Sequence, residues 1–422
     1  MRIMLMTLPS EGEPRDYTTP AHYSVGKLRY IPLGILAVAS GIDRKHEVRI
    51  FDSASFNLGI DEAIKEIRDW QPDVLGMNAS IGTAYSMSRI LAEIQGPLKV
   101  VGGPHTTNFA EQIISLGATA VFIHDADFIF NKWLDDGCQP GIYSGYVEEL
   151  DTLPLPALDL LNLEDYSIKS DQSGKVLLKN QGLRFPMYSS KGCPFRCTFC
   201  DTQQRSFRYK SPKRVVDEME IYLDHGAETV HMMDDCFNLK RSQVLEICAE
   251  IQRRNLKFTW SARGRAKIDL KTAKALKESG CVRLHVGVET LDRDLLKSIN
   301  KSTNMELMQN FFDVCRQVGI QTLGYFVIGL PGETREYRKK LPELIRKAGI
   351  DIPFFNILFP LPHSDLYDDF VASGVYKSDF WKEYALNPTP DFQPPPYADE
   401  ELHQELLDTA EWYVQEFFNE KN

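Results

Sequence analysis

The feature that most constrains the fold of this chain is the repeated alternation of short apolar runs with amphipathic stretches. Between residues 1 and 150, five runs typical of β-strands are separated by helical patterns: RIMLMT, HEVRIFD, DVLGMNAS, LKVVGG and ATAVFIH. Strands that alternate with helices in this way form a parallel sheet with helices on both faces. We therefore expect residues 1–150 to fold as an α/β domain with a doubly wound, Rossmann-like sheet.

A second series of the same kind begins at residue 183. Its apolar runs also alternate with helical patterns: RFPMYSS, TVHMMDD, KFTWSAR, VRLHVGVE, QTLGYFVIG and PFFNILFP. A closed barrel of this type has eight strand–helix units, so the series predicts a partial (β/α)6 barrel over residues 183–360. Residues 151–182 contain prolines and no sustained period, which is typical of a linker. Residues 361–422 are expected to form a short helical C-terminal segment.

Composition narrows the classes of function. The net charge of −11 argues against nucleic-acid binding, because that function needs a basic surface. No apolar run approaches the roughly 18 residues of a membrane span, and the N-terminus does not have the pattern of a secretory signal peptide. Eight cysteines in 422 residues are too few for a disulfide framework. We expect a cytoplasmic protein with no nucleic-acid partner and no membrane span.

Three cysteines lie close together in the stretch SSKGCPFRCTFC, directly after the first strand of the second series: Cys193, Cys197 and Cys200. Active sites of parallel α/β barrels gather at this end of the strands. A structural zinc site takes four ligands, commonly as two cysteine pairs, and no second pair follows. Three thiolates suit a [4Fe–4S] cluster, since they hold three irons and leave the fourth open.

The strands of the second series carry polar side chains on alternate positions. Because side chains of a strand alternate between its two faces, we expect a polar set to face the barrel interior. Its members are His231, Asp235, Thr259, Ser261, Arg263, Arg283, His285, Gly287 and Glu289. Charged groups inside a barrel are costly unless they pair with one another or with a charged ligand. For Arg283 and His285 a structural role and a functional role stay equally open.

The cysteine motif and the stretches that follow it resemble those of radical S-adenosylmethionine (SAM) enzymes. The similar stretches occur in the order of that family: MMDDCFNL, WSARGRAKID, GCVRLHVGVET and YFVIGLPGET. The resemblance implies a [4Fe–4S] cluster on the three cysteines. It also implies SAM contacts at five residues: Asp234, Asp235, Ser261, Arg263 and Glu289. One of the two aspartates would meet the SAM ammonium, Arg263 its carboxylate, and Glu289 its ribose or amino group.

Residues 1–150 resemble the cobalamin-binding domain that precedes the barrel in one large subgroup of this family. The similar stretches are YIPLGILAVASGI, PDVLGMNASIGTAYS and VVGGPHTTN. A doubly wound sheet binds its ligand beyond the carboxyl ends of its strands. The resemblance therefore implies cobalamin contacts in two loops: Asn78, Ser80, Gly102, Gly103, Pro104 and His105. The chain lacks the Asp-x-His-x-x-Gly motif of other cobalamin proteins, which implies a cobalt without a histidine ligand.

Together, the two resemblances imply a cobalamin-dependent radical SAM C-methyltransferase. In such enzymes a 5′-deoxyadenosyl radical activates an unreactive carbon and methylcobalamin supplies the methyl group. The implied cofactors are a [4Fe–4S] cluster, SAM and cobalamin, and an external electron donor is a required partner. Tyr325 and Asn356 are candidate catalytic residues that position the substrate, although a core role is equally open for Tyr325.

Three other interpretations stay open from the sequence. The chain can be a cobalamin-dependent radical SAM enzyme without methyl transfer, such as an oxidative cyclase or an enzyme of ring rearrangement. It can be a radical SAM enzyme whose N-terminal domain binds no cobalamin, or a corrin-binding regulator with a vestigial barrel. The substrate is open as well: a small molecule, or a peptide or protein residue such as a glutamine of methyl-coenzyme M reductase.

Overall fold

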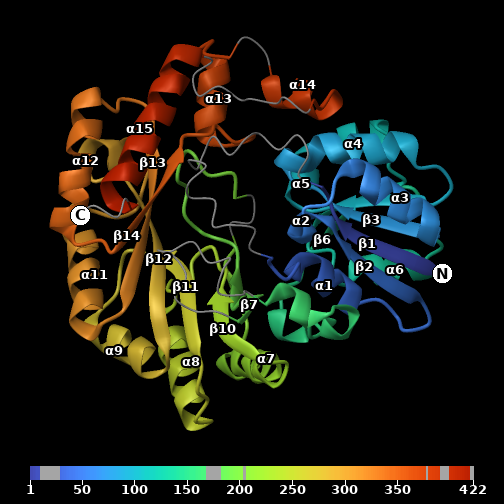
Figure 1. The fold of residues 1–422 in the computed structure, drawn as a ribbon, viewed down its shortest axis with the longest axis horizontal. Coiled ribbons are helices and arrows are strands. Elements are labelled where there is room, and N and C mark those ends of the chain that lie inside the picture. The colour runs from blue at the N-terminus through green and yellow to red at the C-terminus, as the bar shows by residue number, and fades with distance from the viewer. Residues whose placement is uncertain (10–28, 168–181, 203–205, 377–378, 390–398, 419–422) are drawn as a thin grey trace. The chain divides into compact units, whose positions relative to one another are not determined.

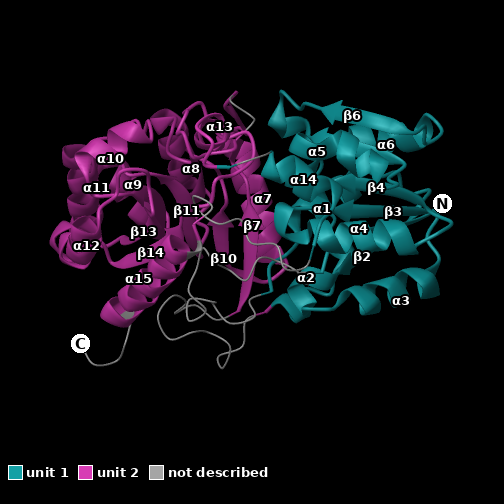
Figure 2. Ribbon diagram, turned by 90° about the horizontal axis from the view of Figure 1, so that it is seen from above, with its two compact units in different colours: residues 1–15, 27–166, 376–393 teal, residues 16–26, 167–375, 394–422 magenta. Residues whose placement is uncertain are grey.

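The computed structural model describes residues 1–9, 29–167, 182–202, 206–376, 379–389 and 399–418. The chain divides into two compact units (Figure 2). Unit 1 comprises Met1–Arg15, Lys27–Tyr166 and Tyr376–Gln393, and unit 2 comprises Asp16–Gly26, Ser167–Val375 and Pro394–Asn422. Parts of the expected linker and of the C-terminal segment lie outside the described residues.

Unit 1 contains a six-stranded, fully parallel sheet in the order β2-β1-β3-β4-β5-β6. The strands are β1 (Arg2–Thr7), β2 (Glu47–Asp52), β3 (Val74–Asn78), β4 (Leu98–Gly102), β5 (Ala120–His124) and β6 (Gly141–Gly145). The first five are the runs that the sequence predicts. The sixth was not predicted, because its sequence GIYSG has no apolar run and its side chains alternate in exposure at the edge of the sheet.

Helices cover both faces of this sheet (Figure 1). They are α1 (Leu33–Ser40), α2 (Ser53–Phe56), α3 (Ile60–Trp70), α4 (Ala84–Glu93), α5 (Pro104–Ser115) and α6 (Ile129–Asp135). Alternate residues of β1 serve opposite cores: Met4 and Met6 pack with α3 and α4, whereas Ile3 and Leu5 pack with α1 and α6. This two-sided burial confirms the doubly wound fold class.

Unit 2 contains six parallel strands in the order β14-β13-β12-β11-β10-β7, with no pairing between the two edge strands. They are β7 (Leu183–Met187), β10 (Ala227–Met232), β11 (Thr259–Arg265), β12 (Cys281–Glu289), β13 (Gln321–Ile328) and β14 (Ile352–Ile357). The sheet is therefore an open half-barrel, as the sequence predicts. After β7, two short strands pair antiparallel on either side of the cysteine loop: β8 (Ser190–Lys191) and β9 (Arg208–Tyr209).

The helices of unit 2 follow its strands along the outer face of the half-barrel (Figure 1). They are α7 (Pro212–Asp224), α8 (Arg241–Arg253), α9 (Leu270–Glu278), α10 (Arg293–Ser298), α11 (Met305–Val318) and α12 (Arg335–Ala348). The apolar strand residues beneath them, such as Met232, Trp260 and Val288, are fully buried. Most of the polar residues that alternate with them keep accessible surface, as expected for an interior face.

The described part of the C-terminal segment contains three helices: α13 (Asp365–Ala372), α14 (Phe380–Leu386) and α15 (Glu400–Phe418). Helix α14 belongs to unit 1, where it packs on α5 and Tyr384 Oη donates to Ile81 O at 3.4 Å. Helix α15 packs on β14 and α12, with the rings of Phe355 and Tyr413 4.5 Å apart. No helix in the described part of the chain is both long and apolar enough to span a bilayer.

The turn after β13 holds a buried acid. The Gly329 N–H donates to the Glu333 carboxylate, and Arg338 Nη1 lies 3.6 Å from it. Gly329 has a φ of 87°, and a Cβ there would lie 2.7 Å from Leu406 of α15, so the turn requires glycine. Burial raises the pKa of Glu333 to about 7, although the Gly329 N–H and Arg338 oppose this.

This pKa predicts a pH-dependent stability. Because the pKa of Glu333 is raised by folding, its contribution is fully present below about pH 4.5 and is lost as the pH rises through about 7. Relative to Glu333→Gln, the wild type should lose up to about 3 kcal/mol of unfolding free energy over this window. Denaturant unfolding of both proteins at pH 5 and pH 8 checks this, and a difference that is constant with pH contradicts it.

Candidate active site

The loop that carries the three cysteines is held from two directions. The Thr198 N–H donates to Ile299 O at 3.1 Å, and Asn300 Nδ2 donates to Arg196 O at 2.7 Å, so the end of α10 holds one side. On the other side, the Leu366 N–H at the start of α13 donates to Thr198 O at 2.8 Å. The loop therefore has a fixed backbone within unit 2.

The three thiols are free, and they differ in exposure. Cys197 is buried, whereas Cys193 and Cys200 are half-buried. Burial raises the pKa of Cys200, and hydrogen bonds with Thr202 oppose this, with Sγ and Oγ1 3.0 Å apart. Within the described residues, no three His, Cys, Asp or Glu side chains converge on a single ion. A [4Fe–4S] cluster does not require such convergence, because its cysteines bind different irons, so three thiols on one short loop fit it.

Asp234, directly after β10, anchors the chain where it leaves β7. Its buried carboxylate accepts hydrogen bonds from Ser189 Oγ at 2.8 Å, from the Ser189 N–H at 3.3 Å and from the Ser190 hydroxyl. Burial raises its pKa, and these hydrogen bonds lower it. Since three donors already occupy Asp234, the arrangement favours Asp235 as the aspartate that meets the SAM ammonium.

Asp235 and Arg263 have the chemistry that the amino-acid part of SAM requires. Asp235 is exposed as a whole residue, but partial burial of its carboxylate raises its pKa, while the Gly192 N–H and Arg263 lower it. Arg263 Nε is buried and has no hydrogen-bond partner among the described residues. A buried donor of this kind needs an acceptor. A carboxylate acceptor for Arg263 and an ammonium beside Asp235 would satisfy both groups, so the residues fit SAM.

Two histidines lie together on the interior face of the half-barrel. The rings of His231 and His285 are 4.8 Å apart, His231 Nδ1 is hydrogen-bonded to the Ser261 hydroxyl, and His285 Nδ1 lies 3.2 Å from Tyr325 Oη. Burial first, and then the nearby arginines, lower the pKa of His231 to about 3. Burial, then His231 and the arginines, lower the pKa of His285 well below its usual value. Both rings are therefore neutral at pH 7. Ser261, an expected SAM contact, is engaged with His231.

Arginines supply the positive charge of this interior face. Arg283 Nε donates to Gln321 Oε1 at 2.8 Å. Burial and the nearby Arg184 lower the pKa of Arg283, but an arginine side chain stays protonated in proteins. The interior therefore carries net positive charge around two neutral histidines.

Glu289, an expected SAM contact at the end of β12, forms a nearly buried ion pair. Its carboxylate lies 2.6 Å from Lys301 Nζ, and both side chains are 9% exposed. Glu289 has a φ of 63°, and a Cβ on Gly287 would lie 2.3 Å from Glu289 Oε1, so the glycine provides room for the pair. A carboxylate balanced in this way can still accept a hydrogen bond from a ribose hydroxyl.

The two candidate catalytic residues lie on neighbouring strands and share a face. Tyr325 on β13 pairs in register with Phe354, and Asn356 on β14 pairs with Val327. All four side chains are half-buried, whereas the residues that alternate with them are buried. Both candidates therefore face the interior of the half-barrel. Burial raises the pKa of Tyr325, which keeps its hydroxyl protonated.

In unit 1, the expected cobalamin contacts meet at the carboxyl edge of the sheet. Asn78 pairs in register with Gly102, and the Ala79 N–H donates to Gly102 O at 2.8 Å. Gly103 has a φ of 100°, and a Cβ there would lie 2.2 Å from Asn78 Oδ1, so this position requires glycine. A Cβ on Gly102 would meet nothing closer than Phe122 O at 4.0 Å. Without a side chain, Gly102 therefore leaves open space at this edge of the sheet, which we call the Gly102 notch.

The remaining cobalamin candidates flank this notch. The Ser80 N–H donates to Thr83 Oγ1 at 2.9 Å, and Pro104 begins α5. The ring of His105 is buried against Phe109, 4.9 Å between centroids, and neither of its nitrogens has a partner among the described residues. Burial lowers the pKa of His105 to about 4, so the ring is neutral. Five candidates therefore line the edge, whereas His105 lies beneath it.

Sequence reasoning missed the residues that support these groups. Ser189 and Ser190 are far from Asp234 in the chain, and Lys301 lies on a different loop from Glu289. The Ser-Ser pair just before the cysteine loop was a usable signal, since hydroxyls commonly anchor a buried carboxylate. No local pattern marks Lys301 as the partner of Glu289.

Two family models match the chain in the order that the structure shows. The B12 binding domain matches residues 24–129, and the radical SAM superfamily matches residues 187–345. The first range contains the strands β2 to β5 of unit 1, and the second contains the cysteine loop and the strands β10 to β13. The chain is a cobalamin-dependent radical SAM enzyme. The cofactors expected for this family are thereby confirmed: a [4Fe–4S] cluster, SAM and cobalamin.

Known proteins similar to this radical SAM enzyme include methyltransferases and a cyclase. An uncharacterised methyltransferase of Pyrococcus horikoshii is 26% identical over 84% of this chain and 81% of its own length. The anaerobic magnesium-protoporphyrin IX monomethyl ester cyclase of Rubrivivax gelatinosus is 25% identical over 81% of this chain and 66% of its own length. The solved structure of the radical SAM methyltransferase TsrM from Kitasatospora setae, with tryptophan and a SAM analogue bound, has a TM-score of 0.65. It is 15% identical and covers 88% of this chain and 76% of its own, so it shows the shared fold.

The anchoring role of Asp234 can be tested against its neighbour. Asp234→Ala should cost about 2–4 kcal/mol of unfolding free energy, because two hydroxyls and one N–H lose their buried acceptor. Asp235→Ala should cost less than about 1 kcal/mol, since Asp235 is exposed. Anaerobic denaturant unfolding of the iron-free proteins measures both. Iron analysis after reconstitution should show a lower content for Asp234→Ala. Equal stability and equal iron in the two variants would contradict the anchoring role.

The notch at Gly102 gives a test for the cobalamin site. Gly102→Val should fold normally, because a Cβ there has free space, but its side chain should fill the notch and weaken corrin binding at least about tenfold. Gly103→Ala should instead lower the stability of unit 1, since its φ is strained for alanine. Equilibrium binding of hydroxocobalamin and thermal unfolding separate the two effects. Wild-type corrin affinity in Gly102→Val would show that the corrin binds elsewhere.

Proposed function

We propose that this radical SAM enzyme is a C-methyltransferase that methylates an unactivated carbon. The proposal rests on one observation: the chain has one candidate site for the corrin and another for the cluster and SAM. Unit 1 offers the Gly102 notch at its carboxyl edge, and unit 2 offers a fixed cysteine loop beside Asp235 and Arg263. Methyltransferases among the similar proteins support this reaction over other uses of the same cofactors.

The residues of this chain have distinct tasks in the proposed reaction. When bound, the cluster and SAM supply a 5′-deoxyadenosyl radical, and methylcobalamin supplies the methyl group. Asp235 and Arg263 would hold the amino-acid part of SAM, and the Glu289–Lys301 pair would receive its ribose. Tyr325 and Asn356 would position the substrate from β13 and β14. Neutral His231 and His285 would offer hydrogen bonds without titrating near pH 7.

A second candidate function is oxidative cyclisation without methyl transfer. The cyclase of Rubrivivax gelatinosus covers nearly as much of this chain as the methyltransferase of Pyrococcus horikoshii, at nearly the same identity. The two functions differ in one chemical respect, since only a methyltransferase moves a methyl group from SAM to the corrin. Neither the structure nor the relatives named above support a glutamine of methyl-coenzyme M reductase as the substrate.

The proposed function can be tested without knowing the substrate. The protein is reconstituted anaerobically with iron and sulfide, loaded with cobalamin, reduced, and given SAM that carries a trideuterated methyl group. We expect about four irons and about one corrin per chain, with formation of trideuterated methylcobalamin detected by mass spectrometry. Iron and corrin without labelled methylcobalamin would favour the cyclase-like function. Iron without corrin would contradict both.

Single-residue variants should separate the two cofactors. Cys197→Ser should lose most of the iron and keep the corrin, because the cysteine loop lies in unit 2 and the corrin site in unit 1. Cys138→Ser is the matched control, since Cys138 is also a free cysteine but lies in unit 1, before the amino end of β6 and not at the carboxyl edge of the sheet. It should keep both cofactors. Loss of iron in Cys138→Ser, or wild-type iron in Cys197→Ser, would contradict the assignment of the cluster.

A further inference from the structure

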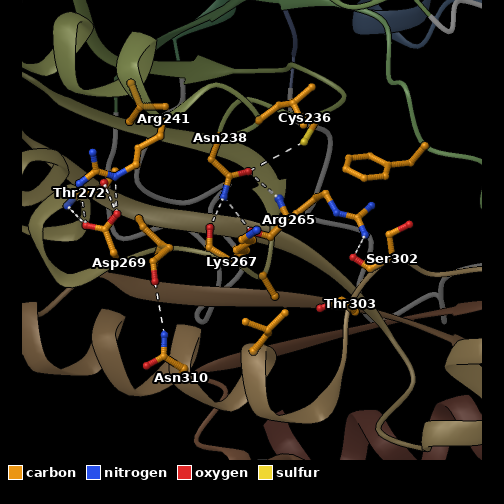
Figure 3. Close-up of a pocket in the computed structure, with 16 residues that line it drawn as sticks. Cys236, Asn238, Arg241, Arg265, Lys267, Asp269, Thr272, Ser302, Thr303 and Asn310 are labelled. Carbon is orange, nitrogen blue, oxygen red and sulfur yellow. Dashed lines mark hydrogen bonds and ion pairs between the residues drawn. The ribbon is translucent and has the colours of Figure 1, made fainter.

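A cavity of about 470 Å3 opens beside the cysteine loop in unit 2 (Figure 3). Its walls come from the ends of β10 and β11 and from helices α8, α9 and α11. They include Leu239, Val244, Arg265, Ile268, Thr272 and Asn310. Phe195, two residues after Cys193, lines one end together with Cys236. His231, Ser261 and Arg263 of the interior face do not line it.

The walls of this cavity are fixed by hydrogen bonds. Asn238 Oδ1 accepts from the Arg265 N–H at 2.8 Å, and Asn238 Nδ2 donates to Arg265 O and Lys267 O at 2.8 and 2.9 Å. The Arg265 guanidinium donates to Ser302 O at 2.8 Å and lies 3.8 Å from the centroid of the Phe195 ring. The Arg265–Phe195 contact therefore joins the cavity wall directly to the cysteine loop.

The rim of the cavity is basic. Five exposed cations lie on or next to it, and we call them the basic strip: Lys240, Arg241, Lys267, Lys271 and Lys274. The acid on the rim, Asp269, is bound by Arg241. Within the described part of the chain, Lys267, Lys271 and Lys274 form no ion pair. A second, shallow hollow of about 460 Å3 extends along α9 past Lys271 and Lys274, with Glu278 as its acidic member.

We propose that the basic strip is the docking surface for an acidic protein that carries one electron to the cluster. The inference rests on the proposed function, in which the cluster must receive one electron from outside the chain. In the docked complex a reduced flavoprotein or iron–sulfur protein gives up one electron and becomes oxidised, and the cluster is reduced by that electron. Complementary charge speeds such encounters and fixes their orientation. The basic strip includes the unpaired Lys267, Lys271 and Lys274, and the adjoining cavity wall is linked to the cysteine loop through Arg265 and Phe195, so this surface meets both needs.

The location also leaves groups of the interior face accessible. Since His231, Ser261 and Arg263 do not line the cavity, a protein docked there does not cover them. A nucleic acid is the other polyanion that a basic strip can attract. It is disfavoured because the strip is short and the chain as a whole carries a net charge of −11.

Stopped-flow reduction of the reconstituted holoprotein tests the proposal. The test variant is the triple change Lys267→Glu, Lys271→Glu and Lys274→Glu, whose lysines make no ion pairs and therefore tolerate reversal. The matched control is Lys339→Glu, Lys340→Glu and Lys347→Glu, which reverses three exposed, unpaired lysines of α12. The electron donor is a reduced flavodoxin, and loss of the visible absorbance of the cluster reports the rate. Photoreduced deazariboflavin, a small uncharged reductant, shows whether each cluster is intact.

We expect the strip variant to be reduced by flavodoxin at least about tenfold more slowly than wild type at low salt, with the difference shrinking at high salt. The control variant should stay within about twofold of wild type, and deazariboflavin should reduce all three proteins equally. Equal flavodoxin rates in all three proteins would overturn the docking surface. Binding of a single-stranded oligonucleotide to the wild type but not to the strip variant, with flavodoxin rates unchanged, would assign the strip to nucleic acid instead.

These outcomes are independent of the test of the proposed function. Methylcobalamin formation can be driven by deazariboflavin, which does not need the basic strip. Absence of labelled methylcobalamin under those conditions contradicts methyl transfer, whereas equal flavodoxin rates contradict only the docking surface.

Discussion

The geometry of the cysteine loop depends on one buried carboxylate. Asp234 accepts two hydroxyls and an N–H from the two serines that follow β7, and it thereby fixes the point from which the loop starts. Burying a charged acid is costly unless its oxygens are occupied, so this contact is stable only with both serines in place. Asp235, the next residue, is then held at the loop with an exposed carboxylate. Of two consecutive aspartates, Asp234 thus anchors the loop and Asp235 stays available to bind a ligand.

The two units differ in what their expected ligand sites offer. In unit 1 the sheet edge gains space through the absence of side chains, since Gly102 leaves a notch and Gly103 lets the chain turn tightly around Asn78. In unit 2 the interior face of the half-barrel offers polar and charged side chains, among them Arg263, His231 and His285. The first arrangement suits a large, flat molecule and the second suits a small, charged one. This difference supports the proposal that unit 1 holds the corrin and unit 2 holds SAM.

Patterns within short stretches of sequence predicted most strands and the position of the cysteine loop, because a strand and the loop at its carboxyl end are adjacent in the sequence. The apolar runs predicted eleven of the twelve long strands that the structure describes, and the cysteine spacing marked the loop after β7. Contacts between distant residues were not predictable in the same way. Glu289 was recognised, but its partner Lys301 was not, because the pairing depends on a positive φ and on the space left by Gly287. The burial of His105, an expected cobalamin contact, against Phe109 was not predictable from the sequence either.

The net charge of the whole chain does not describe the charge of any one region of its surface. A charge of −11 describes the whole chain, but charges farther away than about 8 Å are largely screened at physiological salt. An approaching protein therefore responds to the groups nearest to it, and around the cavity beside the cysteine loop those are Lys267, Lys271 and Lys274. The acidic surface elsewhere discourages long polyanions, which would have to cover it, while the basic strip still attracts a compact acidic protein. The same composition that argues against nucleic acid is thus compatible with an acidic electron donor at one defined place.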